Sequence, residues 1–270
     1  MSSGSRSGMW SCDLSIPVSR RDSAWMEGRP VVRSAASYGQ ALWSLRPSGR
    51  VKERMITMKI GAKQKLLFIG DSITDCGRAQ PVGTGNGLGG GYVSLVNALL
   101  TTVYPERRIL VMNTGTSGHT VPDLKVRWKR DVLDLKPDWL SIMIGINDVW
   151  RQFDCALDPR NHVLPNIYEE TLRALVDATQ VKGLVMMSPY YIEDNRSDDM
   201  RKRMDQYGAI VRKIAKQKGA IFVDTQAAFN AVLKHLPSEM FAWDRVHPGV
   251  AGHMILARAF LNGVGFKWSR

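Results

Sequence analysis

Five short apolar runs, separated by longer amphipathic stretches, constrain the fold of this chain more than any other feature. They are LLFI (66–69), ILVM (109–112), WLSIMI (139–144), GLVMM (183–187) and AIFV (220–223). Runs of this length are typical of strands buried on both faces. Repeated strand–helix–strand units form right-handed crossovers and a parallel sheet covered by helices. The sequence therefore predicts the α/β class: a three-layer α/β/α sandwich around a five-stranded parallel sheet.

The amphipathic stretches predict the helices of the outer layers. We expect helices over 92–103, 121–135, 167–181, 197–218, 225–236 and 250–261. In the most basic of these, apolar residues recur at intervals of three and four, as on one helical face: Met200, Met204, Tyr207, Val211 and Ile214. Its Lys and Arg residues then form a solvated opposite face, so we expect no nucleic-acid partner in spite of the net charge of +12.

The first 57 residues differ from the rest of the chain. They are rich in serine and arginine and show no sustained period of 2 or 3.6. We expect translation to start at Met58, because Lys52–Arg54 can be encoded by a purine-rich run that resembles a bacterial ribosome-binding site. Residues 1–57 would then be a non-native leader, and the domain would span 58–270. A disordered arm and an organellar transit peptide are the alternatives.

Cysteine usage and hydropathy indicate the cellular compartment of the protein. Cys12, Cys76 and Cys155 are odd in number and form no CxxC pair, which indicates reduced thiols. No apolar run approaches the ~18 residues that span a bilayer. We therefore expect a cytoplasmic protein without a membrane partner.

Polar residues follow the predicted strands at the points where they end. The segments are GDS (70–72), NTGTSGHT (113–120), GIND (145–148) and SPYYIED (188–194), with WDRVHP (243–248) near the end of the chain. The carboxyl ends of parallel strands meet at one edge of the sheet, which is where open α/β sheets bind ligands. We expect the functional site at this edge.

These segments supply the parts of a serine acyl-transfer site. Asp244 and His247 are three residues apart, so in a single turn they face the same side. The carboxylate can hold the imidazole, which can then take the proton of Ser72. Three donors can stabilise an oxyanion: the backbone N–H groups of Ser72 and Gly118 and the side-chain amide of Asn147.

Simpler interpretations exist for each part. A serine after a strand is usually a helix N-cap, and Asp71 can simply hold the turn. The five histidines show neither HExxH nor Cys–His spacing, so we expect no metal and no cofactor. We interpret His253 as a satisfied helix histidine and the glycine-rich segment 82–91 as a flexible surface loop.

The four blocks together resemble those of the SGNH, or GDSL-type, hydrolases: GDS with Ser72, SG with Gly118, GIND with Asn147 and DRVH with His247. Longer stretches, such as LLFIGDSITDCGRA and AWDRVHPGVAGHMILARAFL, resemble the bacterial serine acetylxylan esterases of this family. The resemblance implies a flavodoxin-like fold, a Ser72–Asp244–His247 triad and an oxyanion hole of Ser72, Gly118 and Asn147. It also implies acetylated xylan-derived oligosaccharides as substrates and a homo-oligomer.

Residues near the expected site are candidates for substrate binding: Asp71, Trp150, Arg151, Tyr190, Tyr191 and Trp243. We expect Trp243 to close the acyl side and favour acetyl groups. One departure is His119, where the family often has Asn or Asp. Two alternatives stay open: an esterase for longer acyl chains, such as a lysophospholipase or thioesterase, and a non-catalytic carbohydrate-binding protein.

Overall fold

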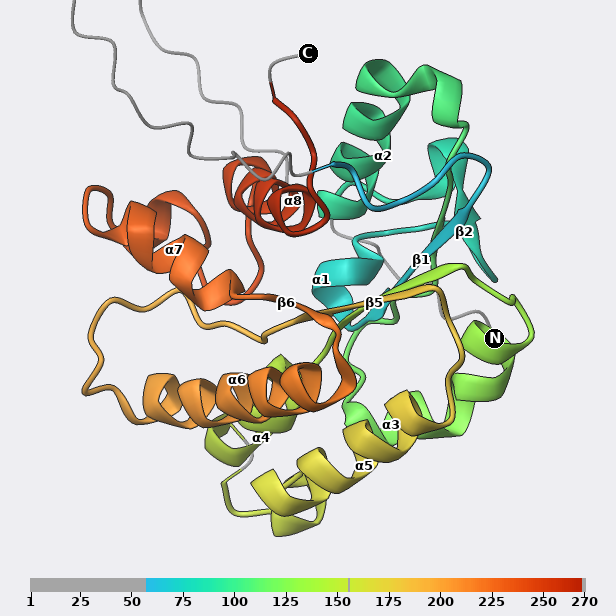
Figure 1. Ribbon diagram of the computed structural model, residues 1–270. Helices are drawn as coiled ribbons and strands as arrows, with labels where there is room; N and C mark the ends of the chain where they lie inside the picture. Colours follow the sequence, from blue (N-terminus) through green and yellow to red (C-terminus); the bar gives the residue numbers. More distant parts are fainter. Residues whose placement is uncertain (1–56, 155, 269–270) are drawn as a thin grey trace, which may run out of the picture. The chain divides into compact units, whose positions relative to one another are not determined.

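The computed structural model describes residues 57–154 and 156–268 (Figure 1). All the described residues fall in one compact unit. The prediction of a leader at 1–57 falls, apart from Thr57, outside the described residues. So do the thiol predictions for Cys12 and Cys155, whereas Cys76 is a free cysteine.

The centre of the domain is a sheet of six strands in the order β2-β3-β1-β4-β5-β6. Neighbouring strands run parallel except for β2, which pairs antiparallel with β3. The predicted parallel α/β sheet is confirmed, and its count of five strands is wrong. The bounds are β1 (Lys65–Gly70), β2 (Gly83–Thr84), β3 (Leu110–Asn113), β4 (Trp139–Met143), β5 (Gly183–Met187) and β6 (Ile221–Val223).

The additional strand, β2, lies in the glycine-rich segment that we interpreted as a flexible loop. Gly83 pairs with Asn113 at the sheet edge, and the backbone of Ala79 donates to the carbonyl of Gly87 at 2.8 Å. Leu88 is buried in the core. The segment is thus an ordered part of the domain, and our interpretation of it as a loose surface loop is wrong.

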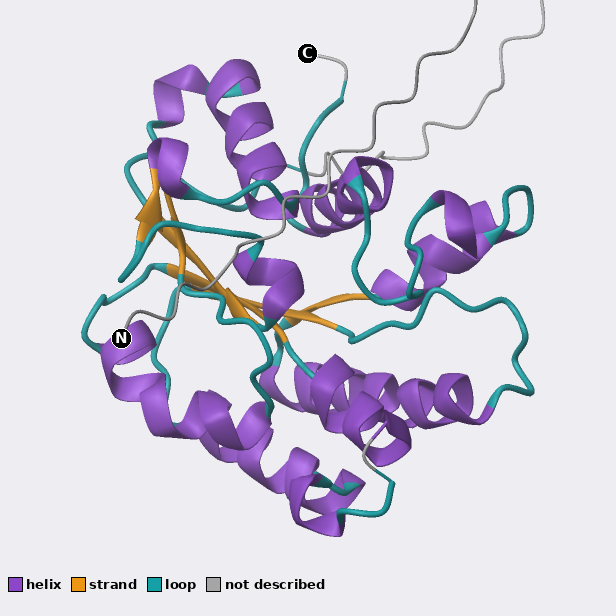
Figure 2. Ribbon diagram, turned by 180° about the vertical axis from the view of Figure 1, so that it is seen from behind, coloured by secondary structure: helices purple, strands orange, loops and turns teal. Residues whose placement is uncertain are grey.

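Helices cover both faces of the sheet (Figures 1 and 2). One layer contains α2 (Tyr92–Val103), α7 (Thr225–Leu233) and α8 (Val250–Gly263), in which α8 contacts both other helices. The opposite layer contains α3 (Val121–Trp128), α4 (Ile146–Asp154), α5 (Pro165–Asp177) and α6 (Asp199–Lys218). The short helix α1 (Ser72–Asp75) follows β1, and a π-helical turn, Lys129–Leu133, continues α3.

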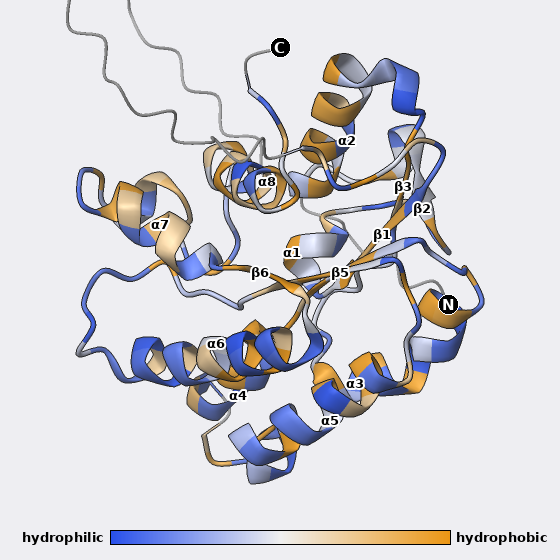
Figure 3. Ribbon diagram, viewed as in Figure 1, coloured by the Kyte–Doolittle hydropathy of each residue, from blue (hydrophilic) through white to orange (hydrophobic). Residues whose placement is uncertain are grey.

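The apolar residues lie where the layers meet (Figure 3). All side chains of Leu66–Ile69 in β1 are fully buried, and the predicted apolar face of α6 is buried as well. The basic residues of α6 form ion pairs at the surface: Arg212 with Asp224, Lys213 with Glu169 and Lys218 with Asp177. The predicted amphipathic helix is therefore confirmed, with one exception. Arg201, which we expected on the solvated face, is buried and forms an ion pair with Asp205 at 3.1 Å. No helix within the described ranges is long and apolar enough to cross a membrane.

The strand order also determines where a ligand can bind. The chain passes from β1 to β3 on one side and then crosses to β4 on the other side of β1. Loops diverge at such a switch point, which opens a crevice beyond the carboxyl ends of the strands. Ser72 lies two residues beyond β1, at this place.

Candidate active site

Three side chains from distant parts of the chain form a continuous hydrogen-bonded row. Ser72 Oγ lies 2.8 Å from His247 Nε2, and His247 Nδ1 lies 2.6 Å from Asp244 Oδ2. The imidazole can therefore accept the serine proton at Nε2 while its Nδ1–H donates to the carboxylate. The structure brings together the three residues that we expected to form a triad.

The turn after β1 places Ser72 at the start of α1. Asp71 is the N-cap, and its side chain accepts a hydrogen bond from the Ile73 N–H at 3.1 Å. Gly70 precedes it because a Cβ there would lie 2.2 Å from the carbonyl oxygen of Met143. Asp71 therefore performs the capping that we considered for Ser72, and the Ser72 hydroxyl is left to face His247.

Asp71 itself does not line an open binding site. Its side chain is buried, and this burial raises the pKa of the carboxyl to about 7, against the opposing effects of the Ile73 N–H and His247. Our interpretation of Asp71 as a substrate-binding residue is therefore wrong. It holds the turn that presents Ser72.

The loop before α8 forms a tight turn around the Asp244 carboxylate. Asp244 Oδ1 accepts from the N–H groups of Val246 at 2.9 Å and His247 at 2.8 Å. Burial acts to raise the pKa of Asp244, but the hydrogen bonds from His247 and from these N–H groups outweigh it, and the pKa is lowered. Asp244 thus stays ionised and able to stabilise an imidazolium.

Two tyrosines support this loop from below. The Tyr190 hydroxyl donates to the carbonyl of Val246 at 3.3 Å, and the ring of Tyr191 lies 5.1 Å below the Arg245 guanidinium. Both tyrosines are almost fully buried. Our interpretation of Tyr190 and Tyr191 as substrate-binding aromatics is wrong, because they pack under the histidine loop instead of at the rim.

The predicted oxyanion donors come from three loops. Gly118, in the loop after β3, has a φ of 78°, which favours glycine. Asn147 lies in the first turn of α4 and donates one amide N–H to the carbonyl of His119 at 2.9 Å. The second amide N–H of Asn147 remains available to donate. Within the described residues, the backbone N–H groups of Ser72 and Gly118 also have no hydrogen-bond partner.

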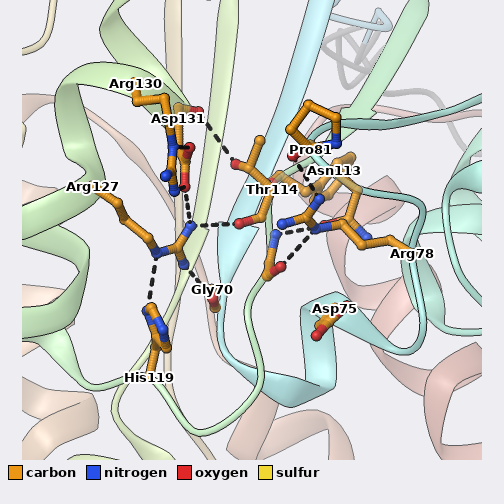
Figure 4. Close-up of polar contacts among 12 residues, drawn as sticks. Gly70, Asp75, Arg78, Pro81, Asn113, Thr114, His119, Arg127, Arg130 and Asp131 are labelled. Atoms are coloured by element: carbon orange, nitrogen blue, oxygen red, sulfur yellow. Dashed lines mark hydrogen bonds and ion pairs between the residues drawn. The ribbon is translucent and has the colours of Figure 1, made fainter.

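Two residues that the sequence reasoning missed hold the oxyanion loop. The Asp75 carboxylate, at the end of α1, accepts two hydrogen bonds from Ser117. The Ser117 backbone N–H donates at 3.1 Å and the Ser117 hydroxyl at 2.8 Å. Arg78 donates through Nε to the carbonyl of Gly115 at 2.6 Å (Figure 4). Asp75 belongs to the GDSITD run that contains the serine, but no local pattern shows that it reaches residue 117.

A buried arginine connects the same loop to the serine turn. Arg127, on α3, donates to the carbonyls of Gly70 at 2.9 Å and Thr114 at 2.5 Å and to the Asp131 carboxylate at 2.9 Å. Its Nε–H donates to His119 Nδ1 at 3.1 Å (Figure 4). The i,i+4 spacing of Arg127 and Asp131 was the one signal that could have indicated this buried pair.

The remaining rim candidates differ in their positions. The Trp150 ring centroid lies 5.9 Å from that of His247, and Arg151 donates to the Gly118 carbonyl at 2.5 Å. Trp243 is 87% exposed. Within this single chain Trp243 therefore does not pack as the acyl-side wall that we expected, and its role in binding the acyl group stays a prediction.

The described residues contain no group of three His, Cys, Asp or Glu side chains that could hold a metal ion. His253 lies on α8, and its Nδ1 accepts a hydrogen bond from the N–H of Tyr92 at 3.2 Å. Burial and the nearby His247 lower the pKa of His253 to about 4. The interpretation of His253 as a satisfied helix histidine is confirmed.

Comparison with known proteins gives consistent matches. Residues 68–255 match the model of the GDSL-like lipase/acylhydrolase family. An acetylxylan esterase of Geobacillus stearothermophilus is 61% identical over 217 residues, 79% of this chain and 99% of that protein. The crystal structure of Axe2, an acetylxylan esterase from Geobacillus stearothermophilus, matches with a TM-score of 0.78 and 61% identity, covering 79% of this chain and 99% of Axe2. LAE5, an alpha/beta hydrolase enzyme from the metagenome of Lake Arreo, Spain, matches with a TM-score of 0.76 and 50% identity, covering 77% of this chain and 98% of LAE5.

Proposed function

Since the chain belongs to the GDSL-like lipase/acylhydrolase family, we propose that it is a serine esterase that removes O-acetyl groups from xylan-derived oligosaccharides. One observation carries the proposed chemistry: the row of hydrogen bonds from Ser72 Oγ through His247 to Asp244. Structures of Axe2 described as catalytic mutants replace a serine, a histidine or an aspartate by alanine. These are the three residue types in the row.

The proposed reaction begins with attack by Ser72. His247 Nε2 takes the hydroxyl proton while Oγ adds to the ester carbonyl, and Asp244 stabilises the imidazolium. The N–H groups of Ser72 and Gly118 and the second amide N–H of Asn147 stabilise the oxyanion. His247 then protonates the departing sugar oxygen, and an acetyl-enzyme is left on Ser72.

Water completes the cycle by the same route in reverse. His247 takes a proton from the water, which attacks the acetyl carbonyl, and then returns a proton to Ser72 as acetate leaves. A non-catalytic carbohydrate-binding protein would have no use for a histidine held between a serine and a carboxylate.

The sugar substrate is supported by the relatives and by the rim. The acetylxylan esterase of Geobacillus stearothermophilus is matched along almost its entire length. Trp150 beside His247 and Arg151 beside Gly118 offer an aromatic face and a cation next to the nucleophile. Aromatic faces combined with polar groups suit sugar rings, and we place the alcohol part of the substrate there. The exposed Trp243 is an additional candidate contact for the sugar.

A comparison of acyl chains tests this proposal. Release of acetate from acetylated xylobiose and xylopentaose is measured beside hydrolysis of p-nitrophenyl acetate, butyrate and octanoate. We expect acetate to be released from the sugars. An acyl site that fits a methyl group would reject longer chains at a cost of roughly 1–3 kcal/mol, so we expect kcat/KM to fall from acetate to butyrate by about 5- to 150-fold. Faster turnover of octanoate, with no acetate released from the sugars, would indicate the lysophospholipase or thioesterase alternative.

We further propose a cytoplasmic homo-oligomer. Several large apolar side chains are exposed near the histidine loop, among them Met240 at 64%, Trp243 at 87% and Val250 at 73%. Exposed apolar groups of this size favour burial against a second copy. Sedimentation analysis of the wild type and of W243A tests the assembly, and an unchanged monomer in both would contradict it. Fractionation of the native host tests the compartment.

A further inference from the structure

His119 occupies a position between the oxyanion loop and the buried arginine. It follows Gly118, and its own carbonyl accepts the amide N–H of Asn147 at 2.9 Å. Its Nδ1 accepts the Nε–H of Arg127 at 3.1 Å (Figure 4). The main chain of His119 therefore contacts one proposed oxyanion donor, while its ring contacts Arg127, which connects the end of β1 to the loop after β3.

The arginine contact determines which nitrogen of His119 carries a proton. The guanidinium of arginine is always a donor and never an acceptor. Nδ1 must therefore present its lone pair to Arg127, and the proton of the neutral ring must lie on Nε2. Within the described residues, Nε2 has no hydrogen-bond partner, so this N–H donor is left available on a half-buried side chain.

Burial and the neighbouring arginines disfavour the charged form of this ring. Burial lowers the pKa of His119, and the cations Arg127 and Arg151 lower it further, against the opposing effects of Asp123 and Asp131. Arg127 and Asp123 lie on α3, Asp131 in the π-helical turn and Arg151 on α4. A second proton on Nδ1 would also break the hydrogen bond from Arg127.

From this geometry we infer that His119 is a substrate-binding residue: its Nε2–H donates a hydrogen bond to an oxygen of the sugar that carries the acetyl group. The two ring nitrogens diverge, so Nε2 faces away from buried Arg127. The inference rests on the proposed function and adds a specificity-determining contact to it. In contrast to His247, His119 transfers no proton.

The tautomer can be observed directly. Nitrogen-15 NMR of the full-length enzyme, labelled at histidine and assigned by comparison with H119N, reports which ring nitrogens carry protons. We expect the signals of His119 to show an unprotonated Nδ1 and a protonated Nε2, without change across the pH range around ~6.5 where an ordinary histidine titrates. A protonated Nδ1, or a charged ring at neutral pH, would overturn the assignment.

Two substitutions separate the donor from the arginine contact. H119N places an amide oxygen near the position of Nδ1, where it can accept from Arg127, but removes the donor at Nε2. H119Q places an amide N–H near the position of Nε2. H235A is the matched control, because His235 is an exposed histidine in the turn that follows α7.

The readout is the ratio of kcat/KM for acetylated xylobiose to kcat/KM for p-nitrophenyl acetate. We expect H119N to lower this ratio about three- to tenfold through KM for the sugar ester, as the loss of one neutral hydrogen bond implies. H119Q should stay closer to the wild type, and H235A should change neither ester. An unchanged ratio in H119N, or an equal loss in both variants, would overturn the inference.

Failure of this inference differs from failure of the proposed function. If the wild type hydrolyses p-nitrophenyl acetate but releases no acetate from the sugar, the proposed substrate is wrong and the contact from His119 falls with it. If the wild type and H119N deacetylate the sugar with the same KM, the proposed function stands and only the assignment of His119 is overturned.

Discussion

At the scale of single residues, either Asp71 or Ser72 could cap the short helix after β1. Both are residue types that cap helices well, but the side chain of Asp71 accepts the hydrogen bond from Ile73. The Ser72 hydroxyl is therefore left for His247. The same division occurs at the histidine loop, where one oxygen of Asp244 holds the backbone turn and the other holds the imidazole.

Replacement of Asp244 tests the second division. In D244N the amide can donate to Nδ1, which favours the tautomer with its proton on Nε2, where it cannot accept from Ser72. We expect kcat to fall by about 10⁴-fold, measured with p-nitrophenyl acetate. D194N, which changes an exposed aspartate in the loop after β5, is the control and should stay near the wild type. A D244N variant with a tenth of the wild-type kcat would show that the carboxylate is not needed.

Asp148 gives a prediction about stability and pH. It is fully buried, its Oδ1 accepts from the N–H of Val121 at 2.9 Å, and its Oδ2 has no partner within the described residues. Its pKa is raised from 3.8 to about 7, because burial, with a smaller contribution from the charge of Asp71, outweighs the opposing hydrogen bond from Val121.

Because the folded state holds this proton more tightly than the unfolded state, the contribution of Asp148 to stability decreases as pH rises from 3.8 to about 7. D148N has no such titration. We therefore expect the unfolding free energy of D148N, relative to the wild type, to increase over this range and then to level off. Denaturant titrations at several pH values measure it, and a difference that does not depend on pH would contradict the raised pKa.

At the scale of elements, long periodic segments could be predicted and short ones could not. The segment 92–103 is the helix α2 with the predicted bounds, and the five apolar runs are β1, β3, β4, β5 and β6. β2 has only two residues, so it has no period to detect. α4 was missed because GIND was interpreted as part of a rim, although the helix begins inside it.

The turn after the π-helical segment is strained. Lys136 is exposed and has a φ of 48°, a conformation that favours glycine over residues with a Cβ. We expect K136G to increase the unfolding free energy by about 0.5–1 kcal/mol, measured by thermal or denaturant unfolding. K136A, which removes the amine but keeps the Cβ, is the matched control. An equal gain in K136A would assign the effect to lost charge rather than to relieved strain.

At the scale of the whole molecule, the site depends on contacts between segments far apart in the chain. Ser72 and His247 are 175 residues apart in the sequence, yet their side chains form a hydrogen bond. The motif residues could be predicted because their types and spacing carry the chemistry. The roles of supporting residues such as Tyr190 and Arg127 could not, because each contacts a loop far away in the chain; the spacing of Arg127 and Asp131 indicates only their own pair.

The kcat of S72A, measured with p-nitrophenyl acetate and acetylated xylobiose, tests the central claim most directly. Removal of the hydroxyl eliminates the acyl-enzyme route, so we predict a fall of about five to six orders of magnitude with both esters. The unfolding midpoint should stay close to that of the wild type. A serine-directed organophosphate should add its mass to Ser72 in the wild type and to no residue in S72A. If folded S72A retained a tenth of the wild-type kcat, Ser72 would not be the nucleophile and the proposed mechanism would be wrong.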